Sequence, residues 1–84
     1  MNNFVYAADT NYNKQLFYSI NSLLNNTDTN LNLHIIHKEP VTFEQYITKL
    51  QNIFNNFSIN LYKFDFSFMD KEASHNFLFI KKLY

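Results

Sequence analysis

The chain has 84 residues, of which 46% are hydrophobic, and its seven basic residues are balanced by seven acidic ones. This length suits one small domain with a thin stability margin, and the hydrophobic share is too high for a disordered segment. A net charge of zero gives no electrostatic reason to expect nucleic acid as a partner. The sequence has no cysteine, which excludes disulfides and thiolate metal ligands.

The sequence also lacks the signals of membrane and secreted proteins. No apolar run approaches the roughly 18 residues of a membrane span, and no basic region precedes the first apolar residues as it does in a signal peptide. We therefore expect a cytoplasmic protein without a membrane span. Glycine is absent as well, so turns that need a positive φ are expected to use Asn or Asp.

The first half of the chain has the pattern strand, helix, strand. Residues 4–8 form a short apolar run that predicts a buried strand. Three cap-forming residues, 9–11, follow it, and apolar residues at helical spacing then predict a helix over residues 12–25. After a polar loop, residues 31–37 alternate in the manner of a second strand.

The second half repeats this alternation. Thr42 and Gln45 fit a capping box at the start of a second helix, and apolar residues keep helical spacing as far as Phe57. Residues 58–64 then predict a third strand. A last helix is expected to begin at Asp70, with four residues on one face: Ala73, Phe77, Ile80 and Tyr84.

This β-α-β-α-β-α order predicts an α/β fold with a three-stranded parallel sheet. The apolar content of the strands fits a sheet covered on both faces. Since a parallel sheet would normally continue past the last predicted helix, we interpret residues 1–84 as a single truncated half-domain. With the strand order third-second-first, the edge of residues 4–8 would be open, which predicts self-association or a complementing chain at this first strand.

The segment after the first strand is the first place to look for a ligand site. Open parallel sheets bind ligands outside the carboxyl ends of their strands, where the strand order reverses, and this segment contains Asp9, Asn11 and Tyr12. A carboxylate can accept from a base N–H, an amide can hold a ribose hydroxyl, and a ring can stack on a base. Equally, Asp9 or Asn11 can be the N-cap of the first helix, and Tyr12 can be a packing residue.

Other chemically versatile side chains have ordinary explanations. His34 and His37 are three residues apart in a strand, so they project to opposite faces and make a poor metal pair. We interpret them as surface or strand-end histidines. Four aromatic residues alternate like a strand, which favours core packing over a stacking platform: Tyr62, Phe64, Phe66 and Phe68.

Residues 4–12, Phe-Val-Tyr-Ala-Ala-Asp-Thr-Asn-Tyr, and residues 19–24, Ser-Ile-Asn-Ser-Leu-Leu, resemble the opening of glycosyltransferase family 8. That family begins with a strand ending in Ala-Ala-Asp-x-Asn-Tyr and a helix containing Ser-Ile-x-Ser-Leu. The resemblance implies a GT-A fold, of the Rossmann-like nucleotide-diphospho-sugar transferase kind, and retaining transfer of a hexose from a UDP-sugar donor.

The resemblance also implies a nucleotide-binding set. Ala7 would supply a backbone contact, with Ala8 beside it in the same loop. Asp9 would accept from the uracil edge, and Asn11 would bond the uracil or the ribose. Tyr12 would stack on the base. The implied partner is therefore a UDP-sugar, or its uridine moiety, held weakly.

The chain departs from the family at the metal site. Full-length family members are expected to bind Mn²⁺ or Mg²⁺ through an Asp-x-Asp motif, and no such motif occurs here. We therefore assign no catalytic or metal-binding residue and no cofactor to this chain, and expect the isolated chain to be inactive as a hexosyltransferase. The alternative is a non-catalytic α/β interaction module derived from such a domain. A receiver-like phosphoacceptor with Asp9 as an acidic residue lacks the rest of its residue set.

Overall fold

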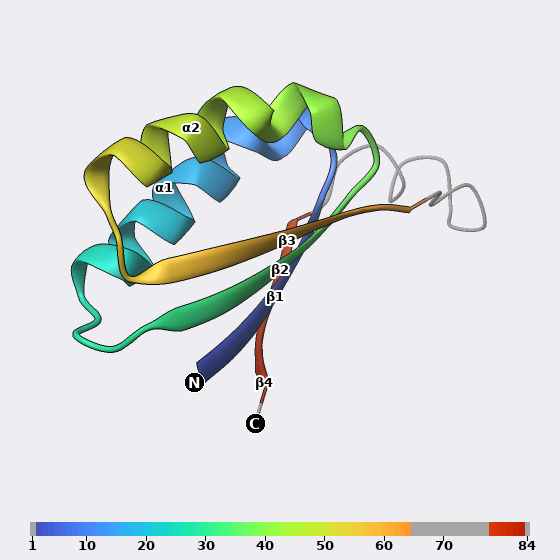
Figure 1. Ribbon diagram of the computed structural model, residues 1–84. Coiled ribbons are helices and arrows are strands. Elements are labelled where there is room, and N and C mark those ends of the chain that lie inside the picture. The colour runs from blue at the N-terminus through green and yellow to red at the C-terminus, as the bar shows by residue number, and fades with distance from the viewer. Residues whose placement is uncertain (1, 65–77, 84) are drawn as a thin grey trace.

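The computed structural model describes residues 2–64 and 78–83 (Figure 1). Its described part is an α/β fold with three parallel strands joined by two helices, as the alternation of apolar patterns predicts. A fourth, antiparallel strand completes a sheet with the order β3-β2-β1-β4. None of the helices in this part of the chain is both long and apolar enough to cross a membrane.

The three parallel strands lie where the sequence predicts them. They are β1 (Asn2–Ala8), β2 (Leu31–His37) and β3 (Phe57–Lys63). Their register brings Ala8, His37 and Lys63 into one row at the carboxyl ends of the strands. This row forms the end of the sheet at which a ligand site was expected.

Each main helix is preceded by a short 3₁₀ turn. The first pair is η1 (Thr10–Tyr12) and α1 (Asn13–Asn25), and the second is η2 (Pro40–Phe43) and α2 (Glu44–Ile53). The predicted apolar stripe of the first helix is confirmed, because Leu16, Ile20 and Leu24 are buried in the core. The second helix ends at Ile53, earlier than predicted, and Phe57 already belongs to β3.

Both described helices cover the same face of the sheet (Figure 1), whereas the sequence suggested cover on both faces. The strand residues that face the helices are apolar, among them Leu33 and Ile35. The opposite face carries hydrogen-bonded polar side chains on neighbouring strands. They connect Asn3, Asn32, His34, Ser58, Asn60 and Tyr62. The buried apolar residues of these strands therefore lie on the face that the helices cover.

The predicted last helix is wrong for residues 78–83, which form the strand β4 (Leu78–Leu83). Ile80 pairs with Tyr6 in the antiparallel ladder, while Asp70, Ala73, Phe77 and Tyr84 lie outside the described residues. The short apolar run around Ile80 is compatible with both the helical and the strand periodicity. Pairing with β1 satisfies the backbone groups along its edge, and that tertiary gain outweighs the helical pattern.

The open edge predicted for the first strand is also wrong. β1 lies inside the sheet, between the parallel β2 and the antiparallel β4. In the described part of the chain, the outer strands are β3 and β4. Any self-association through a strand edge would therefore involve one of these two strands.

Two local expectations fail at turns. Thr42 does not form the predicted capping box, because α2 begins after the 3₁₀ turn and the Thr42 hydroxyl donates to the Glu39 carbonyl at 2.8 Å. No described residue has a positive φ. The described turns therefore need neither glycine nor a left-handed Asn or Asp.

Candidate functional site

The predicted nucleotide loop lies at the carboxyl end of β1. Ala8 is the last residue of that strand, and η1 (Thr10–Tyr12) turns the chain directly into α1. The backbone N–H of Tyr12 donates to the Asp9 carbonyl at 3.1 Å, which closes the turn. The N–H of Lys38 donates to the Ala8 carbonyl at 3.3 Å, so the ends of β1 and β2 stay paired beyond the ladder.

Asp9 has a structural role in this loop. Its Oδ1 accepts the backbone N–H of Asn11 at 3.0 Å, which makes it the N-cap of η1. The side chain is almost wholly buried, with 3% of its surface exposed. The N-cap role weighed for Asp9 is therefore found at η1, whereas the cap position of α1 itself is Tyr12, without a side-chain cap hydrogen bond. A direct contact of Asp9 with a base stays a prediction.

The remaining loop residues differ in their access to solvent. Asn11 is exposed, Ala7 and Tyr12 are half-buried, and Ala8 is fully buried. Tyr12 packs against the hydrophobic core, which confirms the packing alternative for its ring. Solvent access in this loop is therefore concentrated at Thr10 and Asn11.

The buried side chain of His37 forms hydrogen bonds next to this loop. His37, at the end of β2, is 0% exposed. Its Nδ1 lies 2.9 Å from the backbone N of Glu39, and its Nε2 lies 2.7 Å from Oδ1 of Asn13. Because a backbone N–H can only donate, Nδ1 is the acceptor, and Nε2 carries the proton that it donates to Asn13. The ring is therefore neutral in a single tautomer.

Asn13 extends the chain of hydrogen bonds to η2. Its Nδ2 donates to the hydroxyl oxygen of Thr42 at 3.0 Å and approaches the Thr42 carbonyl at 3.4 Å. On the surface, the hydroxyl of Thr10 donates to Oε1 of Glu39 at 3.1 Å. Buried and exposed side-chain hydrogen bonds thus join the loop after β1 and the start of α1 to the end of β2 and to η2.

Burial lowers the pKa of the His37 ring from its usual value, and the Glu39 carboxylate opposes this effect.

The sequence prediction that His34 and His37 face opposite sides of the sheet is confirmed: His34 contacts Tyr62 on the face away from the helices, at 3.2 Å between Nδ1 and the hydroxyl. The prediction that His37 is a surface or strand-end histidine misses its burial. Its partner Asn13 lies 24 positions away, so no local signal marks it.

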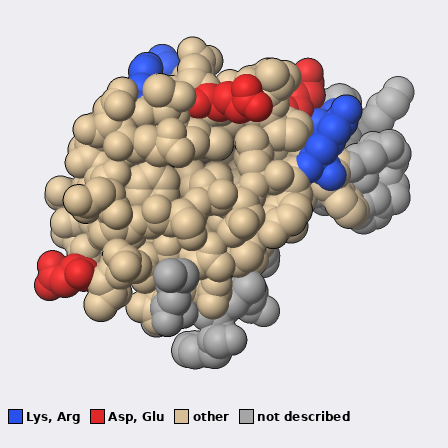
Figure 2. All heavy atoms as spheres, in the orientation of Figure 1, with Lys and Arg blue, Asp and Glu red and all other residues tan. Residues whose placement is uncertain are grey.

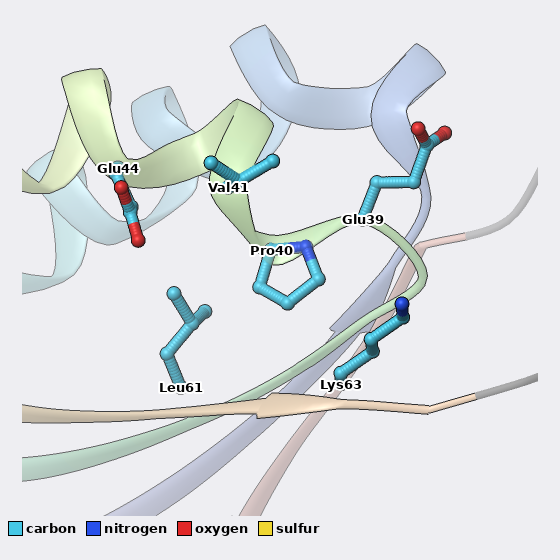
Figure 3. A pocket seen from close by; sticks show the side chains of 6 residues that line it. All are labelled: Glu39, Pro40, Val41, Glu44, Leu61 and Lys63. Atoms are coloured by element: carbon cyan, nitrogen blue, oxygen red, sulfur yellow. The ribbon is translucent and has the colours of Figure 1, made fainter.

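An open pocket of about 580 Å³ lies beside the loop, between the start of α2 and β3 (Figure 3). Leu61 and Pro40 form an apolar surface in it, and Glu44 and Lys63 lie on different sides. Glu39 is shared between this pocket and the loop, since its carboxylate accepts from Thr10. None of the predicted nucleotide-binding residues lines the pocket.

The charge distribution does not favour a diphosphate in this pocket. Two acidic residues, Glu39 and Glu44, and a single basic residue, Lys63, line it. On the face seen in Figure 2, charged side chains are few and scattered among uncharged residues. Among residues 2–64 and 78–83, no three His, Asp or Glu side chains come together in a way that could hold a metal ion.

The aromatic side chains of β3 also differ from expectation. Tyr62, at 47% exposed, and the neighbouring Phe64 are partly open to solvent instead of packed in the core, whereas Phe66 and Phe68 lie outside the described residues. Tyr62 stacks on His34 with 6.0 Å between ring centroids. The alternation of the strand was predicted correctly, but the helices cover only the face that carries Ile59 and Leu61.

No protein-family model matches the chain, and no curated protein or solved structure matches it. The resemblance of residues 4–12 and 19–24 to glycosyltransferase family 8 therefore stays a prediction. The α/β architecture stands on the structure alone.

Proposed function

We propose that this chain binds the uridine moiety of a UDP-sugar in the loop after β1, as part of a GT-A-like domain related to glycosyltransferase family 8. The observation that carries the proposal is the place of this loop. β1 is flanked by the parallel β2 on one side and by the antiparallel β4 on the other. The strand order reverses at β1, and the carboxyl end of a strand at such a reversal is the position at which open α/β sheets bind ligands.

The exposed residues of the loop suit a nucleoside better than a larger anion. The Asn11 amide offers both a donor and an acceptor, which matches the O4 and N3–H groups of a uracil edge. Tyr12 follows Asn11 and is half-buried against the core, and in this proposal its ring also contacts the base. Asp9, held in the cap, keeps the Asn11 backbone in position. In this proposal, the peptide groups of Ala7 and Ala8 line the base of the site.

Binding without transfer is the function that these residues support. Stabilising a departing diphosphate needs a metal ion or several cations placed by the protein, and the pocket beside the loop offers only Lys63. A few hydrogen bonds and one ring contact correspond to affinities on the order of millimolar.

The test compares uridine with N3-methyluridine, followed by NMR on the isolated chain. The methyl group removes the N3–H donor and leaves the ribose and the rest of the ring in place. We expect uridine to shift the amides of residues 7–12 and N3-methyluridine to shift them much less at equal concentration. Equal shifts from both nucleosides would show that the N3–H group of uracil is not recognised, which would contradict the proposed contact with the uracil edge.

One observation favours the second candidate, a non-catalytic interaction module. Among the described residues, two large hydrophobic side chains at the end of β3 are exposed: Tyr62, within the strand, and Phe64, just after it. β3 is also an outer strand of the described sheet. Exposed apolar groups along an outer strand are typical of surfaces that pair with another chain.

A further inference from the structure

Side-chain hydrogen bonds connect the loop after β1 and the first residue of α1 with His37, at the end of β2, and with Glu39 just after it. The exposed link, from Thr10 to Glu39, competes with water and contributes little net stability. The link from His37 to Asn13 is buried at both ends. Losing either partner would leave a buried polar group unsatisfied, which costs more than losing an exposed hydrogen bond.

Asn13 is well placed to transmit this constraint. It is the first residue of α1 and directly follows η1, and its backbone N–H donates to the Thr10 carbonyl. Its side chain accepts from His37 and donates to Thr42, so its amide is fixed between β2 and η2. Asn13 thus connects the end of η1 with both β2 and η2.

We infer that His37 is a positioning residue for the loop after β1: by donating from Nε2 to Asn13, it holds η1 in the conformation that presents Asn11 and Tyr12 to a nucleoside. The ligand part of this inference rests on the proposed function. The part that concerns the order of the loop does not, since Asn11 and Tyr12 have backbone hydrogen bonds that report on η1 without any ligand.

Two conservative variants separate the donor of His37 from its acceptor. In His37→Gln, the side-chain amide group takes the place of Nε2 and retains the donor to Asn13. In His37→Asn, the shorter side chain places an acceptor near the position of Nδ1 and retains only the contact with the N–H of Glu39. Both variants are neutral and similar in polarity, so they form a matched pair.

The first readout is amide hydrogen exchange at Asn11 and Tyr12 in the absence of ligand. We expect His37→Gln to retain the protection of both amides and His37→Asn to lose about tenfold, the equilibrium equivalent of one net hydrogen bond. Equal loss in the two variants would mean that the ring acts only by packing. Unchanged protection in both would mean that the loop does not depend on it. Either result would overturn the inference.

The second readout needs no variant and covers the case in which a substituted chain does not fold. ¹⁵N NMR of the His37 ring in the unmodified protein should show the proton on Nε2, whereas a proton on Nδ1 would contradict the donor role. The UMP affinity of folded variants gives the third readout, with an expected loss of about tenfold in His37→Asn only. If UMP does not bind the unmodified chain, the proposed function fails while the exchange result still decides the role of His37.

Discussion

The Asp9 carboxylate accepts the backbone N–H of Asn11 at 3.0 Å, so the acidic residue of the predicted nucleotide loop is already used to hold its neighbour. This bond closes η1 at its start, and Asp9 is buried while Asn11 is exposed. The two residues therefore differ in their surroundings: Asp9 holds the turn from a buried position, whereas Asn11 lies at the surface.

This division predicts different effects for two substitutions of Asp9. Asp9→Ala removes the cap and should lower the free energy of unfolding by about 1 kcal/mol. Asp9→Asn keeps a cap acceptor and should change stability by less than half of that, about 0.5 kcal/mol at most. Urea denaturation of the two variants gives the comparison. Equal destabilisation by both would show that the negative charge, and not the cap hydrogen bond, is what the loop needs.

The second prediction concerns the dependence of stability on pH. The pKa of His37 is lowered by burial in the folded chain, compared with about 6.5 in the unfolded chain. Below about pH 6.5, the unfolded chain therefore binds a proton that the folded chain does not. The free energy of unfolding should be highest above this pH and fall as the pH drops toward the folded pKa.

The control for this pH effect is His37→Gln, which cannot titrate but keeps the donor to Asn13. Its unfolding free energy should fall less than that of the unmodified chain between about pH 6.5 and about pH 5. The Glu39 carboxylate opposes the lowering of the His37 pKa, so Glu39→Gln should steepen the effect by removing this opposing charge. An identical pH slope in all three proteins would assign the effect to other groups.

The third prediction addresses the core. Leu16 is fully buried between α1 and the sheet, so Leu16→Ala should cost about 3 kcal/mol through lost transfer energy and the cavity left behind. A domain of this size has a small reserve of stability, so the variant should be largely unfolded at a modest urea concentration. Ile53→Ala is the control, because that side chain is exposed, and it should stay within about 0.5 kcal/mol of the unmodified chain.

The fourth prediction tests whether β3 pairs with another chain. If its outer edge drives association, Tyr62→Lys should shift the protein toward a monomer in sedimentation experiments over a concentration series, because a charge on an outer strand opposes pairing. Tyr18→Lys is the matched control, since Tyr18 is equally aromatic, 62% exposed, and located on α1. A protein that stays monomeric at every concentration, with or without the substitution, would remove the interaction-module alternative based on this edge.

The three parallel strands and the first helix could be predicted because their signals are local. Leu16 and Ile20 repeat at helical spacing, and Ile59 and Leu61 alternate at strand spacing, so period alone identifies each element. β4 could not be predicted in this way. The run around Ile80 is apolar enough for either structure, and what decides between them is the edge of β1, which is distant in sequence.

The candidate site shows the same limit. The position of the loop after β1 follows from the strand order, and the cap role of Asp9 follows from its place before a helix. The burial of His37 does not follow from its neighbours, because its partners are the side chain of Asn13 and a backbone N–H in the next turn. Sequence pattern places residues on faces, but hydrogen bonds between distant segments depend on how the elements pack.

The most direct test of the central claim is an NMR titration of the unmodified chain with UMP, CMP and AMP. The three nucleotides share the phosphate and differ in the base, and only uracil carries an N3–H donor beside two carbonyl groups. We expect UMP to produce the largest amide shifts, centred on residues 7–12, and these shifts to saturate at UMP concentrations on the order of millimolar. Equal shifts with all three nucleotides, or shifts centred on Glu44 and Leu61 in the neighbouring pocket, would contradict the claim.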